Sequence, residues 1–244
     1  MQVEVCTFSI ESCLNAQKAG AQRVELCGGL YEGGTTPSYG LIKLARRLLS
    51  LKIYVMIRPR GGDFCYDTYE IETMKSDIEI AKQLGADGVV FGILEPNGKV
   101  NIEVTKELVQ IAYPMGVTFH RAFDVTPDPF EALEAIVETG AERILTSGQH
   151  NTAPEGWQLL EQIVKKANNR IEIMAGAGVN ADNALLLAQT GVNALHLTGK
   201  AVREGAMIFK KEGINMASVL PANEYEIIYS DEVKIRALVE KLHQ

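Results

Sequence analysis

The sequence lacks concentrated positive charge and long apolar runs. Its 244 residues carry 24 lysines and arginines against 31 aspartates and glutamates, a formal net charge of -7. Nucleic-acid binding needs grouped basic side chains that neutralise phosphates. A bilayer-spanning helix needs about 20 consecutive apolar residues. We therefore expect neither a nucleic-acid partner nor a membrane partner.

Cysteine is scarce, and no secretion signal precedes the first apolar segment. The four cysteines are too few for a dense disulfide framework, and we expect them to be reduced. They contain no C-x-x-C pair, so the sequence has no strong local metal motif. No basic segment with an apolar stretch stands ahead of the first predicted strand. These features predict a cytoplasmic protein.

Linkers and dinucleotide-binding loops are also missing. No Pro/Ser-rich linker, low-complexity tract or composition shift divides the chain, which predicts one domain. An open doubly wound sheet would need a G-x-G-x-x-G loop after an early strand. Thr7-Phe8-Ser9 follows the first predicted strand instead. We expect no nucleotide cofactor.

A glycine followed by a short apolar strand recurs along the chain. A glycine just past a helix takes the left-handed conformation easily, so each copy predicts a helix-to-strand joint. Less regular joints precede 53–57 and 171–174, and 3–6 forms a strand at the start, which gives eight predicted strands. The five clear copies begin at Gly20, Gly85, Gly116, Gly140 and Gly191.

Eight strand-and-helix units in 244 residues match a (β/α)8 TIM barrel, which takes about 250 residues. We predict a single α/β domain of this kind over 1–244. Asp128, Asn101 and Asn180 are predicted helix caps, and the helix after Asp128 should run to about Thr139. Ser230 or Asp231 should begin the last helix.

An extended loop is predicted over residues 200–229. Ordinary βα loops have about 2–6 residues. We expect this long one to cover the barrel mouth or to contact a neighbouring subunit in a homo-oligomer, a dimer or larger.

The first two predicted strands place charge and sulfur inside the barrel. Alternate strand residues point into the lumen, and ligands bind at the carboxyl ends of the strands. Glu4 and Cys6 share the inward face of one strand, and Glu25 and Cys27 that of the next. Buried carboxylates and thiols are costly unless they are paired or coordinated. This pattern indicates a functional site.

Charged side chains at other strand ends complete a predicted catalytic set. They supply a general base, a titratable imidazole and anion-binding guanidinium groups. An internal ion-pair network that balances buried carboxylates would use the same residue types, so that alternative stays open. The predicted catalytic residues are Glu25, Arg58, Arg60, His120 and Asp124.

A second set is predicted to bind a substrate or another anion. Barrels often bind phosphate through the backbone of the loops after strands seven and eight. Glycine at these turns would also simply relieve crowding, and a histidine there would also serve as a hydrogen-bonded core residue. The predicted set is Arg121, Ser147, Gly176, Gly178, His196, Thr198 and Gly199.

Four segments resemble signature segments of the CutC family, which is named for copper homeostasis: 56–64, 118–124, 143–148 and 195–199. The similarity runs from Val3 to about Gly199 and resumes in the C-terminal helix. It implies a cytoplasmic, oligomeric (β/α)8 barrel associated with copper handling, and it supplies no reaction. One departure is the segment Ala175-Gly176-Ala177-Gly178, where family members usually have a further glycine and often a proline.

The association with copper makes Cys6 and Cys27 the predicted metal ligands. Cu(I) prefers thiolate and thioether sulfur, and Met56 is predicted to face the same lumen from the third strand. Adjacent strands are about 4.8 Å apart, so two such thiols can bracket one ion. Cysteine is also commonly buried as a small apolar residue. Two function classes therefore remain: a copper-binding protein, and an enzyme that acts by acid/base chemistry on a small anionic metabolite, with or without a phosphate group.

Overall fold

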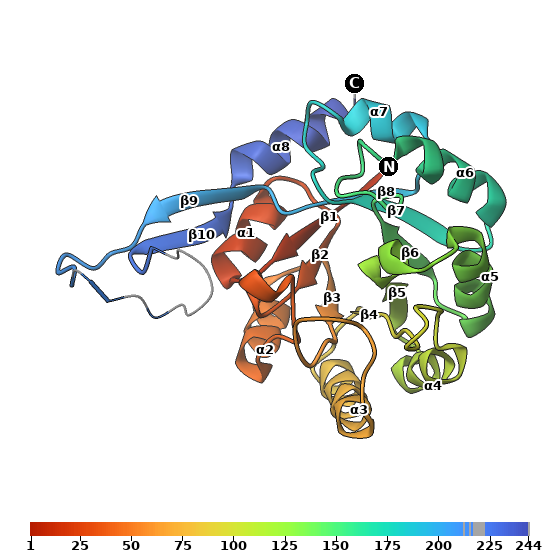
Figure 1. Ribbon diagram of the computed structural model, residues 1–244. Coiled ribbons are helices and arrows are strands. Elements are labelled where there is room, and N and C mark those ends of the chain that lie inside the picture. Colours follow the sequence, from red (N-terminus) through yellow and green to blue (C-terminus); the bar gives the residue numbers. More distant parts are fainter. Residues whose placement is uncertain (212, 215, 217–222, 244) are drawn as a thin grey trace.

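Eight parallel strands close into a barrel, with β1 beside β8 (Figure 1). The structure, a computed structural model, describes residues 1–211, 213, 214, 216 and 223–243. The predicted (β/α)8 barrel is confirmed. Its strands are β1 (Gln2–Thr7), β2 (Arg23–Leu26), β3 (Lys52–Met56), β4 (Gly88–Phe91), β5 (Gly116–Phe119), β6 (Arg143–Thr146), β7 (Glu172–Gly176) and β8 (Ala194–Leu197).

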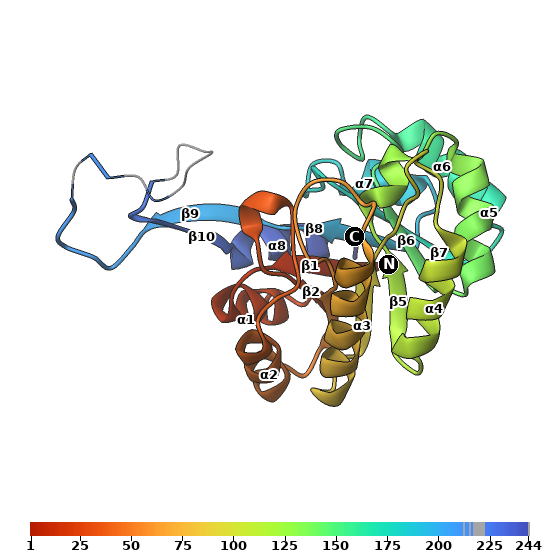
Figure 2. The ribbon, with the colours of Figure 1, turned by 60° about the horizontal axis from the view of Figure 1, so that its bottom comes forward.

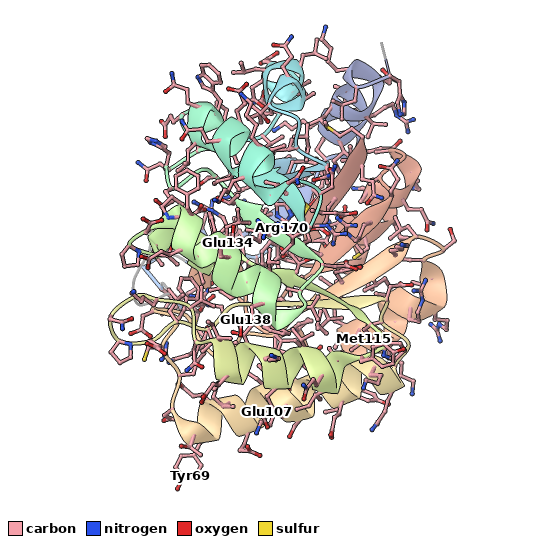
Figure 3. All side chains as sticks on the ribbon, turned by 90° about the vertical axis from the view of Figure 1, so that its right-hand side faces the viewer. Tyr69, Glu107, Met115, Glu134, Glu138 and Arg170 are labelled. Carbon is pink, nitrogen blue, oxygen red and sulfur yellow. The ribbon has the colours of Figure 1, made fainter. Side chains whose placement is uncertain are left out.

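Helices surround the barrel (Figures 1 and 2). On the outer surface Glu134 pairs with Arg170 across neighbouring units at 2.7 Å (Figure 3). The helices are α1 (Ile10–Lys18), α2 (Tyr39–Leu48), α3 (Thr68–Gln83), α4 (Ile102–Ala112), α5 (Pro129–Thr139), α6 (Trp157–Ala167), α7 (Ala184–Gln189) and α8 (Glu232–Lys241), with short 3-10 turns η1 (Leu30–Glu32) and η2 (Arg121–Val125).

The strands separate two buried layers. Val5, Val24 and other outward strand residues pack against the helices in the main core. Cys6 and Cys27 belong to a separate cluster with Tyr54, Met56 and Val90. Because successive strand residues alternate between faces, this second cluster fills part of the lumen. The predicted inward direction of the two thiols agrees with this separation.

Three of the predicted helix caps are confirmed, and one is wrong. The side chains of Asn101, Asp128 and Asp231 accept hydrogen bonds from the first turns of α4, α5 and α8. Asn180 does not cap α7, because its side-chain oxygen accepts from the backbone of a turn at 182–183. The helix begins three residues later than that prediction requires, after Asn183.

Four of the five predicted glycine joints have the expected backbone. Gly20, Gly85, Gly140 and Gly191 all have positive φ, between 81° and 90°. Gly116 is the exception, because it lies inside β5 and is not among the positive-φ residues. A Cβ at that position would collide with the Tyr54 hydroxyl and the Glu142 carboxylate. Glycine there permits close packing rather than a left-handed turn.

The segment predicted as a loop begins and ends in strands. β9 (Lys200–Glu204) and β10 (Glu226–Ser230) pair antiparallel, and they run outward from the barrel beside α1 (Figures 1 and 2). Ser230 anchors the pair on α1, since its amide donates to Ser12 Oγ at 3.0 Å. Residues 212, 215 and 217–222 of the predicted loop lie outside the described residues. No helix in the described ranges is long and apolar enough to cross a membrane.

Candidate metal and anion site

A cavity of about 400 Å³ opens at the carboxyl ends of the barrel strands. Active sites of (β/α)8 barrels lie at the carboxyl ends of the strands. A larger hollow of about 660 Å³ lies beside α4 and α5, but it contains none of the predicted site residues. From the predicted sets, the smaller cavity is lined by Cys6, Glu25, Arg58, His120, Arg121, Gly178, His196 and Thr198.

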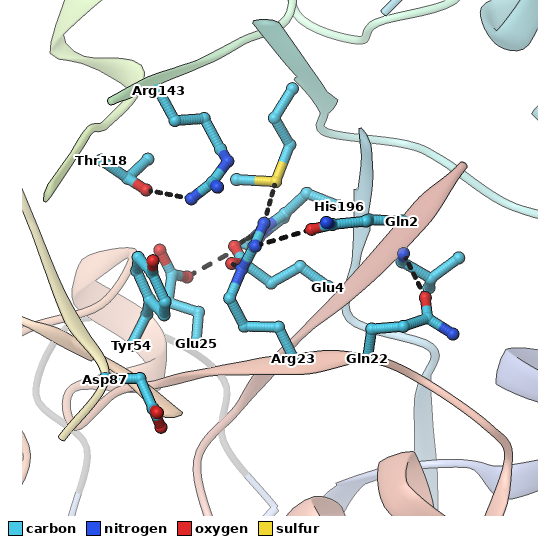
Figure 4. A network of polar contacts seen from close by, with 12 residues as sticks. Gln2, Glu4, Gln22, Arg23, Glu25, Tyr54, Asp87, Thr118, Arg143 and His196 are labelled. Carbon is cyan, nitrogen blue, oxygen red and sulfur yellow. Dashed lines mark hydrogen bonds and ion pairs between the residues drawn. The ribbon is translucent and has the colours of Figure 1, made fainter. Parts of the chain in front are cut away.

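Figure 4 shows a buried network of polar contacts that includes Glu4, Arg23 and His196. Glu4 is fully buried, pairs with Arg23, and contacts His196 Nδ1 through Oε1 at 2.8 Å. Burial by itself would raise the pKa of Glu4, but the Arg23 and His196 charges and hydrogen bonds lower it to about 2. Glu4 is therefore ionised throughout the physiological pH range. Glu4 thus takes part in an internal ion-pair network, which was the alternative to a functional site for the buried carboxylates.

Two arginines on the lumen floor were missed by the sequence reasoning. Arg23 and Arg143 lie over the Tyr54 ring, with guanidinium carbons 4.9 and 5.4 Å from its centroid. Arg143 also pairs with Glu172 at 2.6 Å. A signal for Arg23 was present, because the alternation that turns Glu25 inward also turns Arg23 inward. The positive charges of Arg23 and Arg143 balance the negative charges of Glu4 and Glu172 on the lumen floor.

Sulfur, carboxylate and imidazole converge above that floor. Cys6 Sγ and Cys27 Sγ are 3.8 Å apart. Cys27 Sγ is 3.5 Å from Glu25 Oε2, and His196 Nε2 is 3.7 Å from the same oxygen. Cys6, Glu25 and His196 each offer a ligand atom, and these three atoms lie within 4.8 Å of one another. The grouping can hold a metal ion.

The pKa values of Cys6, Glu25 and His196 depend on one another's charges. The hydrogen bond with Cys27, opposed by burial and assisted by His196, lowers the pKa of Cys6 to about 5. Burial opposes protonation of His196, but the Glu25 charge and the bonds to Cys6 and Glu4 raise its pKa well above the ordinary value. Burial, and then the Cys6 charge, raise the pKa of Glu25. Without metal, Cys6 is accordingly a thiolate beside an imidazolium.

Another part of the cavity wall carries unpartnered polar atoms. His120 Nδ1 accepts from the Ala122 amide at 3.2 Å, which leaves the proton of a neutral ring on Nε2. Burial, reinforced by the Arg58 charge, lowers the pKa of His120 to about 3, so the ring is neutral at physiological pH. Among the described residues, His120 Nε2, Arg58 Nε and Glu25 Oε1 have no hydrogen-bond partner. Buried polar groups are normally satisfied, so three such atoms around one cavity indicate a ligand.

Two predicted catalytic residues do not line the cavity. Arg60 pairs with Glu70 at 2.5 Å and Asp63 at 3.1 Å, and 38% of its side chain is exposed. Asp124 pairs with Arg121 at 2.7 Å and accepts from the Ser147 amide. Ser147 Oγ in turn accepts from Arg121 at 2.9 Å. Asp124 and Ser147 therefore hold Arg121, which does reach the cavity.

Of the predicted glycines in the loops after β7 and β8, only some line the cavity. Gly178 lies on the cavity wall, but Gly176 and Gly199 do not. A Cβ at Gly176 would lie 2.5 Å from Leu145 Cδ1, and one at Gly199 would lie 2.8 Å from Ile235 Cγ1. Relief of crowding accounts for the glycine at Gly176; at Gly199 a left-handed φ of 56° favours glycine as well.

The sequence profile of the CutC family matches residues 1–201. This chain belongs to the CutC family. A CutC family protein of Bacteroides fragilis is 47% identical over 98% of this chain and 96% of its own. The copper homeostasis protein cutC homolog of Homo sapiens is 43% identical over 97% of this chain and 87% of its own. A solved structure of CutC from Streptococcus agalactiae superposes with a TM-score of 0.78 at 40% identity, over 81% of this chain and 98% of that one.

Proposed function

We propose that this protein handles copper by binding Cu(I) between Cys6 and Cys27. The observation that carries the proposal is the sulfur separation of 3.8 Å. With a metal–sulfur bond of about 2.3 Å, two sulfurs on one ion are about 3.8 Å apart at a tetrahedral angle and about 4.6 Å apart in a linear arrangement. Cu(I) with two thiolates thus needs a movement of less than about 1 Å. The human relative is named for copper homeostasis.

The surroundings of the two sulfurs support this proposal. A thiolate is the form that binds metal, and the pKa of Cys6 is lowered to about 5. Met56 packs in the same buried cluster and brings a thioether near the pair. Two thiols this close would readily become a disulfide in an oxidising compartment, whereas the cytoplasm keeps thiols reduced. A cytoplasmic location is part of the proposal.

The test is an anaerobic Cu(I) titration against a competing chelator. We compare wild type with Cys6→Ser and Cys27→Ser, and use Cys65→Ser as the control because Cys65 lies in the loop after β3. Each lumen variant should weaken Cu(I) binding at least tenfold, and the control should leave it unchanged. Wild-type affinity in both lumen variants would refute the proposal.

The polar atoms of the cavity wall that have no hydrogen-bond partner among the described residues favour a second candidate function, an enzyme acting on a small anionic metabolite. Arg58 and Arg121 supply positive charge, and His120 supplies a neutral N–H donor. Glu25, with its raised pKa, is the acid/base group of this candidate. A thermal-shift screen of phosphorylated and carboxylated metabolites tests it, with Arg121→Gln as the comparison. Ligands that stabilise wild type and not the variant would support it; an unresponsive panel would eliminate it.

The proposal also includes a homo-oligomer, in which subunits contact one another through the outward strand pair β9/β10 and the segment between these strands. The segment that follows β9 carries exposed apolar side chains, with Ile208 98% and Phe209 71% accessible. Exposed apolar groups gathered on one segment mark interaction sites, and a second copy offers the same surface in return. Light scattering should show a dimer or larger species for wild type and a smaller one for Phe209→Glu. A monomeric wild type would refute it.

A further inference from the structure

We infer that Cys6, Glu25 and His196 form an open site for a divalent cation of the Zn²⁺ class, distinct from the Cu(I) pair and sharing only Cys6 with it. The inference does not depend on copper binding. Cys6 lies on β1, Glu25 on β2 and His196 on β8, and β1 is flanked by β2 and β8 in the closed barrel. All three side chains are buried and all three line the cavity.

The first argument is the donor geometry. In a tetrahedral zinc site with bonds of about 2.0–2.3 Å, neighbouring donor atoms lie about 3.3–3.6 Å apart. His196 Nε2 and Glu25 Oε2 are 3.7 Å apart, and the Cys6 sulfur completes a group within 4.8 Å. Small side-chain movements therefore bring three donors onto one ion. A mixed sulfur, nitrogen and oxygen set suits zinc better than it suits Cu(I), which selects sulfur.

The second argument is the support behind His196. Its Nδ1 contacts Glu4 Oε1 at 2.8 Å, and Glu4 is held in turn by Arg23. Metal-binding histidines usually donate their other ring N–H to a carboxylate, which fixes the tautomer and the ring orientation. With the proton on Nδ1, the Nε2 lone pair is directed to the side where Glu25 lies. The structure thus contains the outer partner of a metal ligand as well as the ligand.

The third argument is the open position. Glu25 Oε1 is buried and has no hydrogen-bond partner among the described residues. Cys27 neither lines the cavity nor belongs to the group of donor atoms within 4.8 Å of one another, whereas all three ligands line the cavity, so a metal on these residues can take its fourth ligand from the hollow. Three protein ligands with one free position is the pattern of catalytic zinc rather than structural zinc. Arg58 and His120 line the same hollow, so the fourth ligand is a water molecule or a small anion.

The test separates the two metal sites by their unshared ligands. Metal-free protein is titrated anaerobically with Co²⁺, an optical probe for Zn²⁺, then with Zn²⁺ against a chelator, and separately with Cu(I). Glu25→Gln and His196→Gln should each weaken Zn²⁺ binding at least tenfold and weaken Cu(I) binding less than Cys27→Ser does, because both metals share Cys6, whose pKa depends on Cys27 and His196. Cys27→Ser should weaken Cu(I) binding at least tenfold and Zn²⁺ binding less than Glu25→Gln and His196→Gln do. Bound Co²⁺ should give a sulfur charge-transfer band that disappears in Cys6→Ser.

Two results would overturn the inference. One is the absence of stoichiometric Zn²⁺ binding by wild type. The other is Zn²⁺ binding that survives both Glu25→Gln and His196→Gln but is lost in Cys27→Ser, which would put the ion on the two thiols. Circular dichroism of each metal-free variant confirms that the barrel is folded, and Glu25→Gln is the less disruptive of the two because Glu25 Oε1 has no partner to lose. Zinc binding without Cu(I) binding would reject only the copper proposal.

Discussion

Replacement of Glu4 by glutamine should destabilise the barrel strongly and in a pH-dependent way. Glu4 is the anion between two cations, Arg23 and protonated His196, and it has no exposed surface. Glutamine preserves the shape of the side chain but removes its charge. Arg23 is then left buried without a counterion, and removing one partner of a buried pair is more damaging than removing both.

The magnitude follows from the pKa of Glu4. A pKa lowered from the ordinary 4.5 to about 2 corresponds to about 3 kcal/mol at 1.36 kcal/mol per pH unit. Breaking a buried pair costs about 3–5 kcal/mol by a separate comparison. The folded pKa is the lower one, so this stabilisation is complete above about pH 4.5 and is lost as the pH falls toward 2. Below pH 5, His196 is protonated in the folded and unfolded chains, so its titration cancels.

The assay is urea unfolding of wild type and Glu4→Gln at intervals between pH 7 and pH 2.5. The difference in unfolding free energy should be about 3 kcal/mol at pH 7 and should shrink by about 1.4 kcal/mol per pH unit below pH 4.5. Glu172→Gln is the matched control: it also removes a carboxylate paired with a buried arginine, but Glu172 is 42% exposed. Solvent screening should keep its effect below about 1 kcal/mol. A difference that is small at pH 7, or constant with pH, would refute the reasoning.

Three further outcomes are expected. Ala177→Gly should raise the unfolding free energy by about 0.5–1 kcal/mol, because Ala177 has φ of 77°, which is costly for any residue with a Cβ; a loss of stability in thermal unfolding would contradict this. Gly116→Ala should lower the urea midpoint by the equivalent of about 1–3 kcal/mol, because the new methyl meets Tyr54; an unchanged midpoint would show that the ring moves aside. Alkylation of Cys6, followed by mass spectrometry, should be half-maximal near pH 5, whereas a rise centred near pH 8.5, typical of a free thiol, would show that its pKa is not lowered.

Most of the barrel could be predicted because its signals are local. The glycines past each helix and the alternation within each strand depend on neighbouring residues alone, and they gave the correct fold and the inward direction of Glu25 and Cys27. Alternation fails where a strand ends. β3 stops at Met56, so Arg60 follows the geometry of a loop and pairs with Glu70 instead of continuing the inward face.

The metal ligands could be predicted only in part, because their grouping depends on closure of the barrel. Glu4 and His196 are 192 positions apart in sequence, and only the pairing of β1 with β8 makes them neighbours. The sequence indicated an anion-binding or core role for His196. It could not indicate that Glu4 would hold the ring from one side while Glu25 lies on the other. That arrangement requires the register of both strands, which pairs Glu4 with His196 directly.

Stability and binding are separated along the axis of this barrel. On the floor, Arg23 and Arg143 are fully engaged by carboxylates and the Tyr54 ring. At the mouth, Arg58 Nε and His120 Nε2 are buried without partners among the described residues. A folded chain tolerates such unsatisfied atoms when a ligand completes them. Floor substitutions should therefore change the unfolding free energy, and mouth substitutions should change ligand or metal affinity. Glu4 connects the two regions, because the carboxylate that neutralises Arg23 also orients His196, so Glu4→Gln is the variant in which both quantities should change together.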